Sequence, residues 1–224
     1  MKSAAHTETE DQTKHNMDRM YRLTRHVYDL SRKYYLLGRD RLIENLKPRD
    51  GEAVCEVGCG TARNLIKMAR TYPNARFYGL DASDEMLKTA QESLKKNNLL
   101  ERVPLAQAYA QTFDPHALFA LTTPFDKIVF SYALSIIPPW RESIDHALTL
   151  LPTNGQLHIV DFGGMDNQPA WFRKLIFWWL SLFHVYHKPE ILNYLKRLEL
   201  EKRGTLSVQH LYRGYTYLAV FTKA

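Results

Sequence analysis

Apolar residues follow two different spacings along this chain of 224 residues. Short apolar runs typical of buried strands alternate with segments whose apolar residues recur every three or four positions, as on one helix face. The predicted strands are Ala53–Val57, Arg76–Leu80, a weaker Val103–Ala108, Phe125–Ser131 and Gln156–Phe162. The helices are expected near Ala62–Thr71, Asp84–Asn97 and Trp140–Leu151. Strands that alternate with helices predict an α/β fold with a parallel sheet.

The pattern changes after the fifth predicted strand. Ala170–His184 is a helix candidate that is apolar nearly all round, and Pro189–Lys202 is an ordinary amphipathic helix. Two further strands, Leu206–Tyr212 and Tyr215–Thr222, are joined by Arg213-Gly214, which is a hairpin signal. The sequence therefore predicts a seven-stranded sheet that is mostly parallel and ends in an antiparallel hairpin.

A helical extension precedes the first strand. Apolar residues from Met17 to Leu46 have helical spacing, and Gly38 is the expected break between two helices. Residues 1–16 are expected to be a disordered tail, since the start of the chain is polar and acidic, without the apolar core of a secretory signal. We expect a single domain over residues 17–224, with residues 17–49 as an N-terminal helical lid.

A glycine turn joins the first predicted strand to its helix. Gly58 and Gly60 permit a tight turn and leave no Cβ between the loop and a ligand. Asp81, at the end of the second strand, is placed to accept hydrogen bonds from ribose hydroxyls. Arg63 stands where a dinucleotide loop has its third glycine, which disfavours a pyrophosphate. Glu56 also disfavours a phosphate and suits a cationic ligand.

The run E-V-G-C-G-T followed by G-L-D resembles the cofactor motifs of class I S-adenosylmethionine-dependent methyltransferases, which have a Rossmann-like seven-stranded sheet. The alternative is a nucleotide-binding type of fold that holds another ligand. The resemblance implies that Glu56–Gly60 and Thr61 line the methionine part of S-adenosylmethionine and that Asp81 holds the ribose. Ala82, Met86, Ala110 and Gln111 would lie near the adenine, and Ser131 and Tyr132 near the transferred methyl.

Met17–Ile43 carries a more specific resemblance. This block is similar to the N-terminal signature of bacterial diacylglycerylhomoserine N-methyltransferases, which complete betaine lipids, and Ser131–Pro138 and the terminal R-G-Y-T-Y-L-A run agree with it. The resemblance implies a lipid substrate with an amino acid headgroup. Three successive methyl transfers to its amine would give a trimethylated zwitterion.

An amine that is protonated near neutral pH must lose a proton before its nitrogen attacks a methyl group. Tyr28, Tyr132 and His184 are candidate catalytic acceptors, although His184 suits a packed or interface position equally well. Arg25 and Arg32 could bind the homoserine carboxylate, and tyrosine rings such as that of Tyr132 could hold the cationic intermediates. The alternative is that these side chains only decorate a lid helix or pack at a strand end.

Charge and aromatic residues bear on the partner. The net charge is +6, and ten Lys or Arg against four Asp or Glu lie between Lys14 and Arg49. Such a segment can serve nucleic acid, an anionic membrane or a solvated helix face. Ala170–His184 is rich in Trp and Phe but too short to span a bilayer, so it lies on a membrane surface or packs in the core or a dimer interface.

The remaining expectations concern location and rival functions. Cys55 and Cys59 offer neither a disulfide framework nor a metal site, which fits a reducing cytosol. We expect a cytoplasmic protein, peripheral at the inner face of an anionic membrane, without nucleic acid and with an oligomer possible. The rivals are phosphatidylethanolamine or quinone methylation, a soluble small-molecule methyltransferase, and a nucleic-acid-binding or regulatory protein that retains the cofactor fold.

Overall fold

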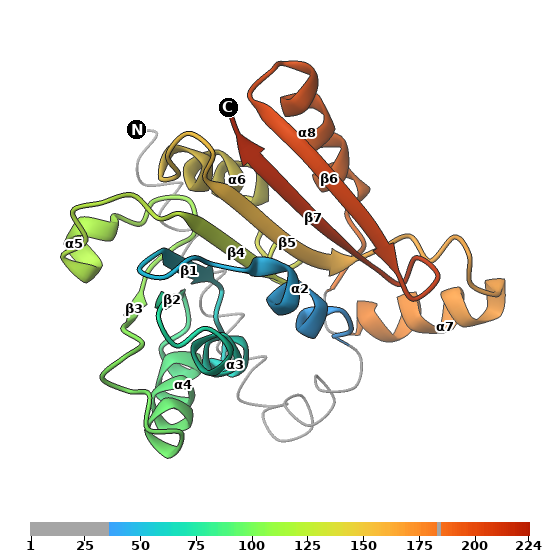
Figure 1. Ribbon diagram of the computed structural model, residues 1–224. Helices are drawn as coiled ribbons and strands as arrows, with labels where there is room; N and C mark the ends of the chain where they lie inside the picture. The colour runs from blue at the N-terminus through green and yellow to red at the C-terminus, as the bar shows by residue number, and fades with distance from the viewer. Residues whose placement is uncertain (1–35, 183–184) are drawn as a thin grey trace, which may run out of the picture.

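One seven-stranded sheet organises the protein in a computed structural model that describes residues 36–182 and 185–224 (Figure 1). Its strand order is β3-β2-β1-β4-β5-β7-β6. The strands are β1 Ala53–Val57, β2 Arg76–Asp81, β3 Leu105–Gln107, β4 Lys127–Ser131, β5 Gln156–Phe162, β6 Gly204–Leu211 and β7 Thr216–Lys223. The pairs among β1 to β5 are parallel, while β7 is antiparallel to β5 and β6. The predicted fold is confirmed.

Helices cover both faces of this sheet. They are α2 Arg39–Leu46, α3 Arg63–Thr71, α4 Asp84–Lys96, α5 Pro115–Phe119, α6 Trp140–Thr149, α7 Ala170–Ser181 and α8 Pro189–Leu200. One apolar cluster joins the sheet to α6 and α8, and a second joins the opposite face to α2, α3 and α4. Because both faces are covered, every residue of β1 is buried, which explains why that strand reads as a continuous apolar run apart from Glu56.

The sequence missed one helix and misplaced several ends. Helix α5 has only five residues, yet it carries a recognisable start, because Asp114 caps it by accepting a hydrogen bond from His116 and Pro115 follows at the first turn. The third strand is shorter than the predicted Val103–Ala108, and β6 begins two residues earlier than expected. Helix α2 begins immediately after Gly38, whose φ is 83°, so the predicted start of a new helix after Gly38 is confirmed.

The turn of the terminal hairpin supports the segment that leads into α7. The backbone N–H groups of Gly163 and Met165 donate to the carbonyls of Tyr215 and Gly214, each at 2.9 Å. The side-chain amide of Gln168 donates to the carbonyl of Tyr212 at 2.8 Å. The hairpin turn and the start of α7 therefore form one connected surface at the carboxyl end of β5.

Some predictions fall outside the described residues, namely the tail at 1–16, most of the helical lid at 17–49, and the last two residues of the expected helix Ala170–His184. Within the described ranges, each helix is too short or too polar to cross a bilayer.

Candidate functional site

The glycine turn lies at the carboxyl end of β1, between β2 and the loop that follows β4. The backbone N–H groups of Gly58 and Cys59 donate to the carbonyl of Leu80 at 2.8 and 3.0 Å. Gly58 has a φ of 73°, and a Cβ added there would lie 2.9 Å from the Cβ of Ala133. A residue with a side chain would be strained at this position and would also press on Ala133, so the turn requires its glycine.

Asp81 fixes the same turn from β2. Its carboxylate accepts hydrogen bonds from the backbone N–H of Gly60 at 2.8 Å and from that of Ser83 at 3.0 Å. A carboxylate has about four acceptor sites on its two oxygens, so it can serve backbone N–H groups and ligand hydroxyls together. Asp81 is therefore a pre-oriented acceptor at the strand end.

Glu56 is a buried carboxylate with an incomplete set of partners. The side-chain amide of Asn64 donates to its Oε1 at 2.7 Å, while Oε2 has no hydrogen-bond partner within residues 36–182 and 185–224. Burial raises the pKa of Glu56 to about 7, although the bond from Asn64 and the charges of Arg39 and Arg63 oppose this shift. An incompletely paired carboxylate of this kind fits a cationic group of a ligand.

The residues expected near an adenine gather beside Asp81. Ala82 follows β2 directly, and the buried Met86 lies in the first turn of α4. The side-chain amide of Gln107 donates to the carbonyl of Ala82 at 3.1 Å. The backbone N–H of Ala108 donates to the carbonyl of Asp81 at 3.1 Å. These bonds hold the segment that carries Ala110 and Gln111 against the end of β2.

Tyr132 has a position that favours a structural role. Its hydroxyl donates to the carbonyl of Leu37 at 2.5 Å and lies 3.0 Å from Oγ1 of Thr216. Burial raises the pKa of Tyr132 well above its usual value. A phenol that holds its proton this firmly is a poor proton acceptor. Its neighbour Ser131, at the end of β4, has a buried Oγ without a partner in the described part of the chain.

Asp161 and Lys188 both bind the loop that follows β4. Asp161 accepts hydrogen bonds from the backbone N–H groups of Ser135 at 3.0 Å and Phe162 at 2.8 Å. The ammonium of Lys188 donates to the carbonyls of Leu134 and Ile137 at 3.1 and 3.2 Å. Burial raises the pKa of Asp161 to about 6, against the opposing charge of Lys188.

The sequence offered a partial signal for this pair. Asp161 ends a predicted strand and could be read as a pocket wall or a loop cap, whereas nothing around Lys188 marked it. Asn64, the partner of Glu56, was also missed, although it lies on the predicted helix after the glycine turn. The expected site residues Arg25, Tyr28, Arg32 and His184 lie outside the described residues.

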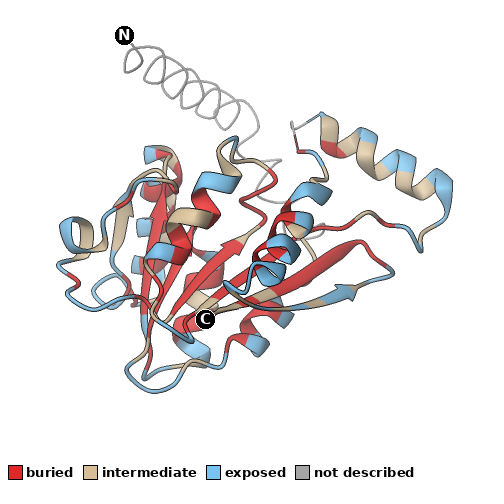
Figure 2. Cartoon of the chain, turned by 90° about the horizontal axis from the view of Figure 1, so that it is seen from above, coloured by how far each residue is buried: buried red, intermediate tan, exposed pale blue. Residues whose placement is uncertain are grey.

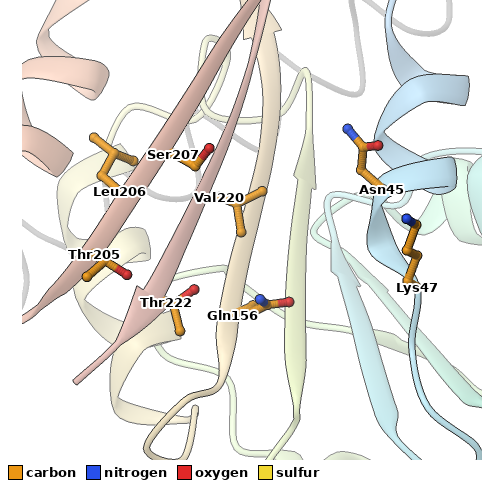
Figure 3. A pocket seen from close by; sticks show the side chains of 8 residues that line it. All are labelled: Asn45, Lys47, Gln156, Thr205, Leu206, Ser207, Val220 and Thr222. Carbon is orange, nitrogen blue, oxygen red and sulfur yellow. The ribbon is translucent and has the colours of Figure 1, made fainter.

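A separate groove of about 500 Å³ lies at the opposite, amino end of β5 (Figure 3). Gln156, the first residue of β5, lines it together with Asn45, Lys47 and polar residues of the terminal hairpin. It contains none of the predicted site residues, so the candidate site remains at the carboxyl edge of the sheet.

Comparison with known proteins finds a matching family model and similar relatives. A family model described as a methyltransferase domain matches residues 48–191. A curated demethylmenaquinone methyltransferase from Listeria welshimeri is 28% identical over 143 residues, which are 63% of this chain and 58% of that protein. The chain thus spans less than two thirds of the length of this relative.

Two solved structures show the same fold. The S-adenosylmethionine-dependent methyltransferase SibL is 17% identical, with a TM-score of 0.66 over 88% of this chain and 57% of that one. A phosphoethanolamine N-methyltransferase from Haemonchus contortus, in complex with phosphomonomethylethanolamine and S-adenosylhomocysteine, is 18% identical. Its TM-score is 0.59 over 77% of this chain and 38% of that one. At these identities the likeness concerns the fold.

Proposed function

The chain belongs to this family of methyltransferase domains, and we propose that it transfers methyl groups from S-adenosylmethionine to the amine of diacylglycerylhomoserine. Three successive transfers would give the trimethylated betaine lipid. The observation that carries the proposal is that a buried carboxylate, Asp161, and the ammonium of Lys188 both bind the one loop that follows β4, beside the glycine turn.

The residues at the glycine turn fit S-adenosylmethionine. Oε2 of Glu56 would accept from its ammonium, and the carboxylate of Asp81, which backbone N–H groups hold at the strand end, would accept from the ribose hydroxyls. Gly58 and Gly60 let the backbone approach the methionine part. When bound, the cofactor supplies an electrophilic methyl group on a sulfonium.

The Asp161 and Lys188 pair suits a headgroup that carries both an amine and a carboxylate. Asp161 would hold the ammonium and take its proton, and Lys188 would pair with the headgroup carboxylate. Before each of the three transfers the nitrogen must lose one proton. Its lone pair then forms a bond to the methyl carbon as the carbon–sulfur bond breaks. A carboxylate whose pKa burial raises to about 6 can accept such a proton near neutral pH.

The loop after β4 links Asp161 to the glycine turn. Ala133 in that loop would touch a Cβ at Gly58, and Ser135 two residues later binds Asp161. The alignment of nitrogen and methyl would therefore depend on a short, well-ordered stretch of backbone, and such alignment is the main contribution an enzyme makes to an in-line displacement.

Methylation of a quinone ring is a second candidate, supported by the similarity to demethylmenaquinone methyltransferase over 63% of the chain. A demethylmenaquinone ring has neither an amine nor a carboxylate, so it would leave Asp161 and Lys188 without a role in acceptor recognition. Phosphatidylethanolamine is a third acceptor class, with an amine but no carboxylate on its headgroup.

To test the proposal, the full chain is incubated with methyl-labelled S-adenosylmethionine and one of three detergent-dispersed acceptors in each reaction. The acceptors are diacylglycerylhomoserine, phosphatidylethanolamine and demethylmenaquinone. We expect label in the homoserine lipid. Asp161→Asn should reduce kcat, and Lys188→Met should raise KM for the homoserine lipid. The exposed Asp166→Asn and Lys196→Met serve as matched controls and should behave as wild type. Label in the quinone or in phosphatidylethanolamine alone would refute the proposal.

A further inference from the structure

Helix α7 presents an apolar stripe to solvent. Its large exposed side chains are Trp171 at 68%, Leu175 at 49%, Trp178 at 60% and Leu182, just past the helix end, at 57% of their full exposure. Their spacing of four, three and four residues places them on one side of a helix. The other side carries Phe172, Ile176, Phe177 and the buried Leu180, which join the apolar cluster of the domain. The side chains of the stripe therefore do not contribute to the packing of α7 against the domain.

Figure 2 shows α7 at the periphery of the molecule, with exposed and half-buried residues along its length. Soluble proteins rarely leave contiguous large apolar side chains in water without a partner, and two tryptophans in one stripe are unusual on a free surface. The stripe is thus a candidate docking surface.

The turn of the terminal hairpin extends this surface. The carbonyl of Tyr212 binds the side chain of Gln168, just before α7, and the Tyr212 side chain is itself 49% exposed. Arg213, next to it, is exposed. Lys174 is also exposed and, by helical spacing, borders the stripe between Trp171 and Trp178. We call the set of Trp171, Lys174, Leu175, Trp178, Leu182, Tyr212 and Arg213 the docking face.

We propose that the docking face binds an anionic lipid surface. Tryptophan and tyrosine favour the interfacial layer of a bilayer, where an apolar ring and a polar N–H or O–H both find partners. Lys174 and Arg213 would contact anionic headgroups, each adding to the attraction. The twelve residues of α7 would lie in the plane of the interface.

Charge argues against a second copy of the chain as the occupant. In a two-fold dimer the same patch meets itself, so Lys174 and Arg213 of one copy would approach those of the other. The net charge of +6 adds to this repulsion. An anionic surface would instead neutralise these cations, so a lipid surface suits the face better.

Docking here would bring the candidate site to the bilayer. Helix α7 follows β5, whose carboxyl end carries Asp161, after a segment held by the hairpin turn. This consequence rests on the proposed function, in which Asp161 and Lys188 bind the headgroup of a membrane lipid. The binding itself can be measured without any methyl transfer.

The test is flotation of the full chain with vesicles of phosphatidylcholine, with or without phosphatidylglycerol. Wild type should float with the anionic vesicles. Trp171→Ser with Trp178→Ser should abolish most of this binding, and Lys174→Gln with Arg213→Gln should weaken it by about fivefold for each charge removed. The matched control is Leu200→Ser, which removes an exposed leucine on α8. Thermal unfolding verifies that each variant is folded.

Failure of wild type to float, or undiminished binding by the folded double tryptophan variant, would overturn the docking face. So would a wild-type dimer that the tryptophan changes convert to a monomer without any vesicle binding, because the occupant would then be a second copy. Methylation of detergent-dispersed homoserine lipid without vesicle binding would refute the docking face alone. Vesicle binding without methylation of that lipid would refute the proposed function alone.

Discussion

Two carboxylates at neighbouring strand ends differ in how far their hydrogen bonds are satisfied. Asp81 accepts two backbone N–H bonds that shape the cofactor turn, whereas one oxygen of Glu56 has no partner in the described part of the chain. A carboxylate that backbone donors already hold in place can orient a ligand at little cost, while a buried carboxylate oxygen without a partner gains most when a cation binds. We therefore expect the two residues to make separate and measurable contributions to cofactor binding.

Asp81→Asn should weaken binding of S-adenosylhomocysteine by about ten- to a hundredfold, because hydrogen bonds to a charged group contribute about 1.5–3 kcal/mol. Isothermal titration calorimetry measures the affinity, and the exposed Asp166→Asn is the control. An unchanged affinity in folded Asp81→Asn protein would remove Asp81 from the cofactor site.

Glu56 should make cofactor binding depend on pH. Burial raises the pKa of Glu56 to about 7, and the ammonium of S-adenosylhomocysteine prefers the ionised carboxylate. Its affinity should therefore increase between about pH 6 and pH 8, and Glu56→Gln should flatten the profile. The same calorimetric titration, repeated across this range, measures both. A wild-type profile as flat as that of the variant would contradict the assignment.

The raised pKa of Glu56 also makes the stability of the protein without cofactor depend on pH. A carboxyl whose folded pKa is raised stabilises the fold most when protonated, so this contribution is lost as pH increases from about 4.5 through about 7. Asp161 acts in the same direction, because burial raises its pKa to about 6. Glu56→Gln should therefore reduce the fall in unfolding temperature over this range.

Gly58 allows steric contact to be separated from backbone strain. Gly58→Ala places a Cβ 2.9 Å from that of Ala133 at a φ of 73°, while Gly51 has a similar φ of 79° and open space around it. Gly51→Ala should cost about 1–2 kcal/mol through strain alone, and Gly58→Ala should cost more. Denaturant unfolding measures both, and equal costs would show that Ala133 yields freely.

Among helices and strands, the bounds predicted from the sequence were most accurate for buried elements. The bounds of β1 and β5 were predicted to the residue, since both are largely apolar and covered on both faces. β3 and α5 were less accessible to prediction because they are short, and no residue of α5 is buried, so periodicity carries little information there. For α5, the cap and proline were the better signal.

Helix α7 shows what an apolar pattern alone leaves open. Its sequence is apolar on nearly all sides, so no face could be assigned to core or solvent from spacing. Only its contacts in the fold distinguish Phe172 and Leu180, which pack inward, from Trp171 and Trp178, which face solvent.

Tyr132 joins three elements through its hydroxyl, which bonds to Leu37 before α2 and to Thr216 on β7. Tyr132→Phe should lower the free energy of unfolding by about 1–2 kcal/mol and change kcat by only a few fold. Unfolding and methyl-transfer rates measured on the same sample test this. A loss of kcat by orders of magnitude in a stable variant would instead make Tyr132 a catalytic residue, which is one of the two roles that the sequence leaves open.

Over the whole molecule, the parallel strands bring the site together from distant parts of the chain. The sequence indicated the candidate cofactor residues Glu56, Gly58, Gly60 and Asp81, because each lies in or directly beside a strand end with a recognisable pattern. It could not pair Asp161 with Lys188, because their proximity depends on how the loop after β4 packs between β5 and α8.

The most direct test of the proposed function is a competition among acceptors. The full chain and S-adenosylmethionine are added to one anionic vesicle preparation that contains equal amounts of diacylglycerylhomoserine, phosphatidylethanolamine and demethylmenaquinone. Mass spectrometry then identifies which of them gains methyl groups. We predict that the homoserine lipid gains up to three, with the other two unchanged. Methylation of the quinone or the phospholipid, with the homoserine lipid unchanged, would contradict the account.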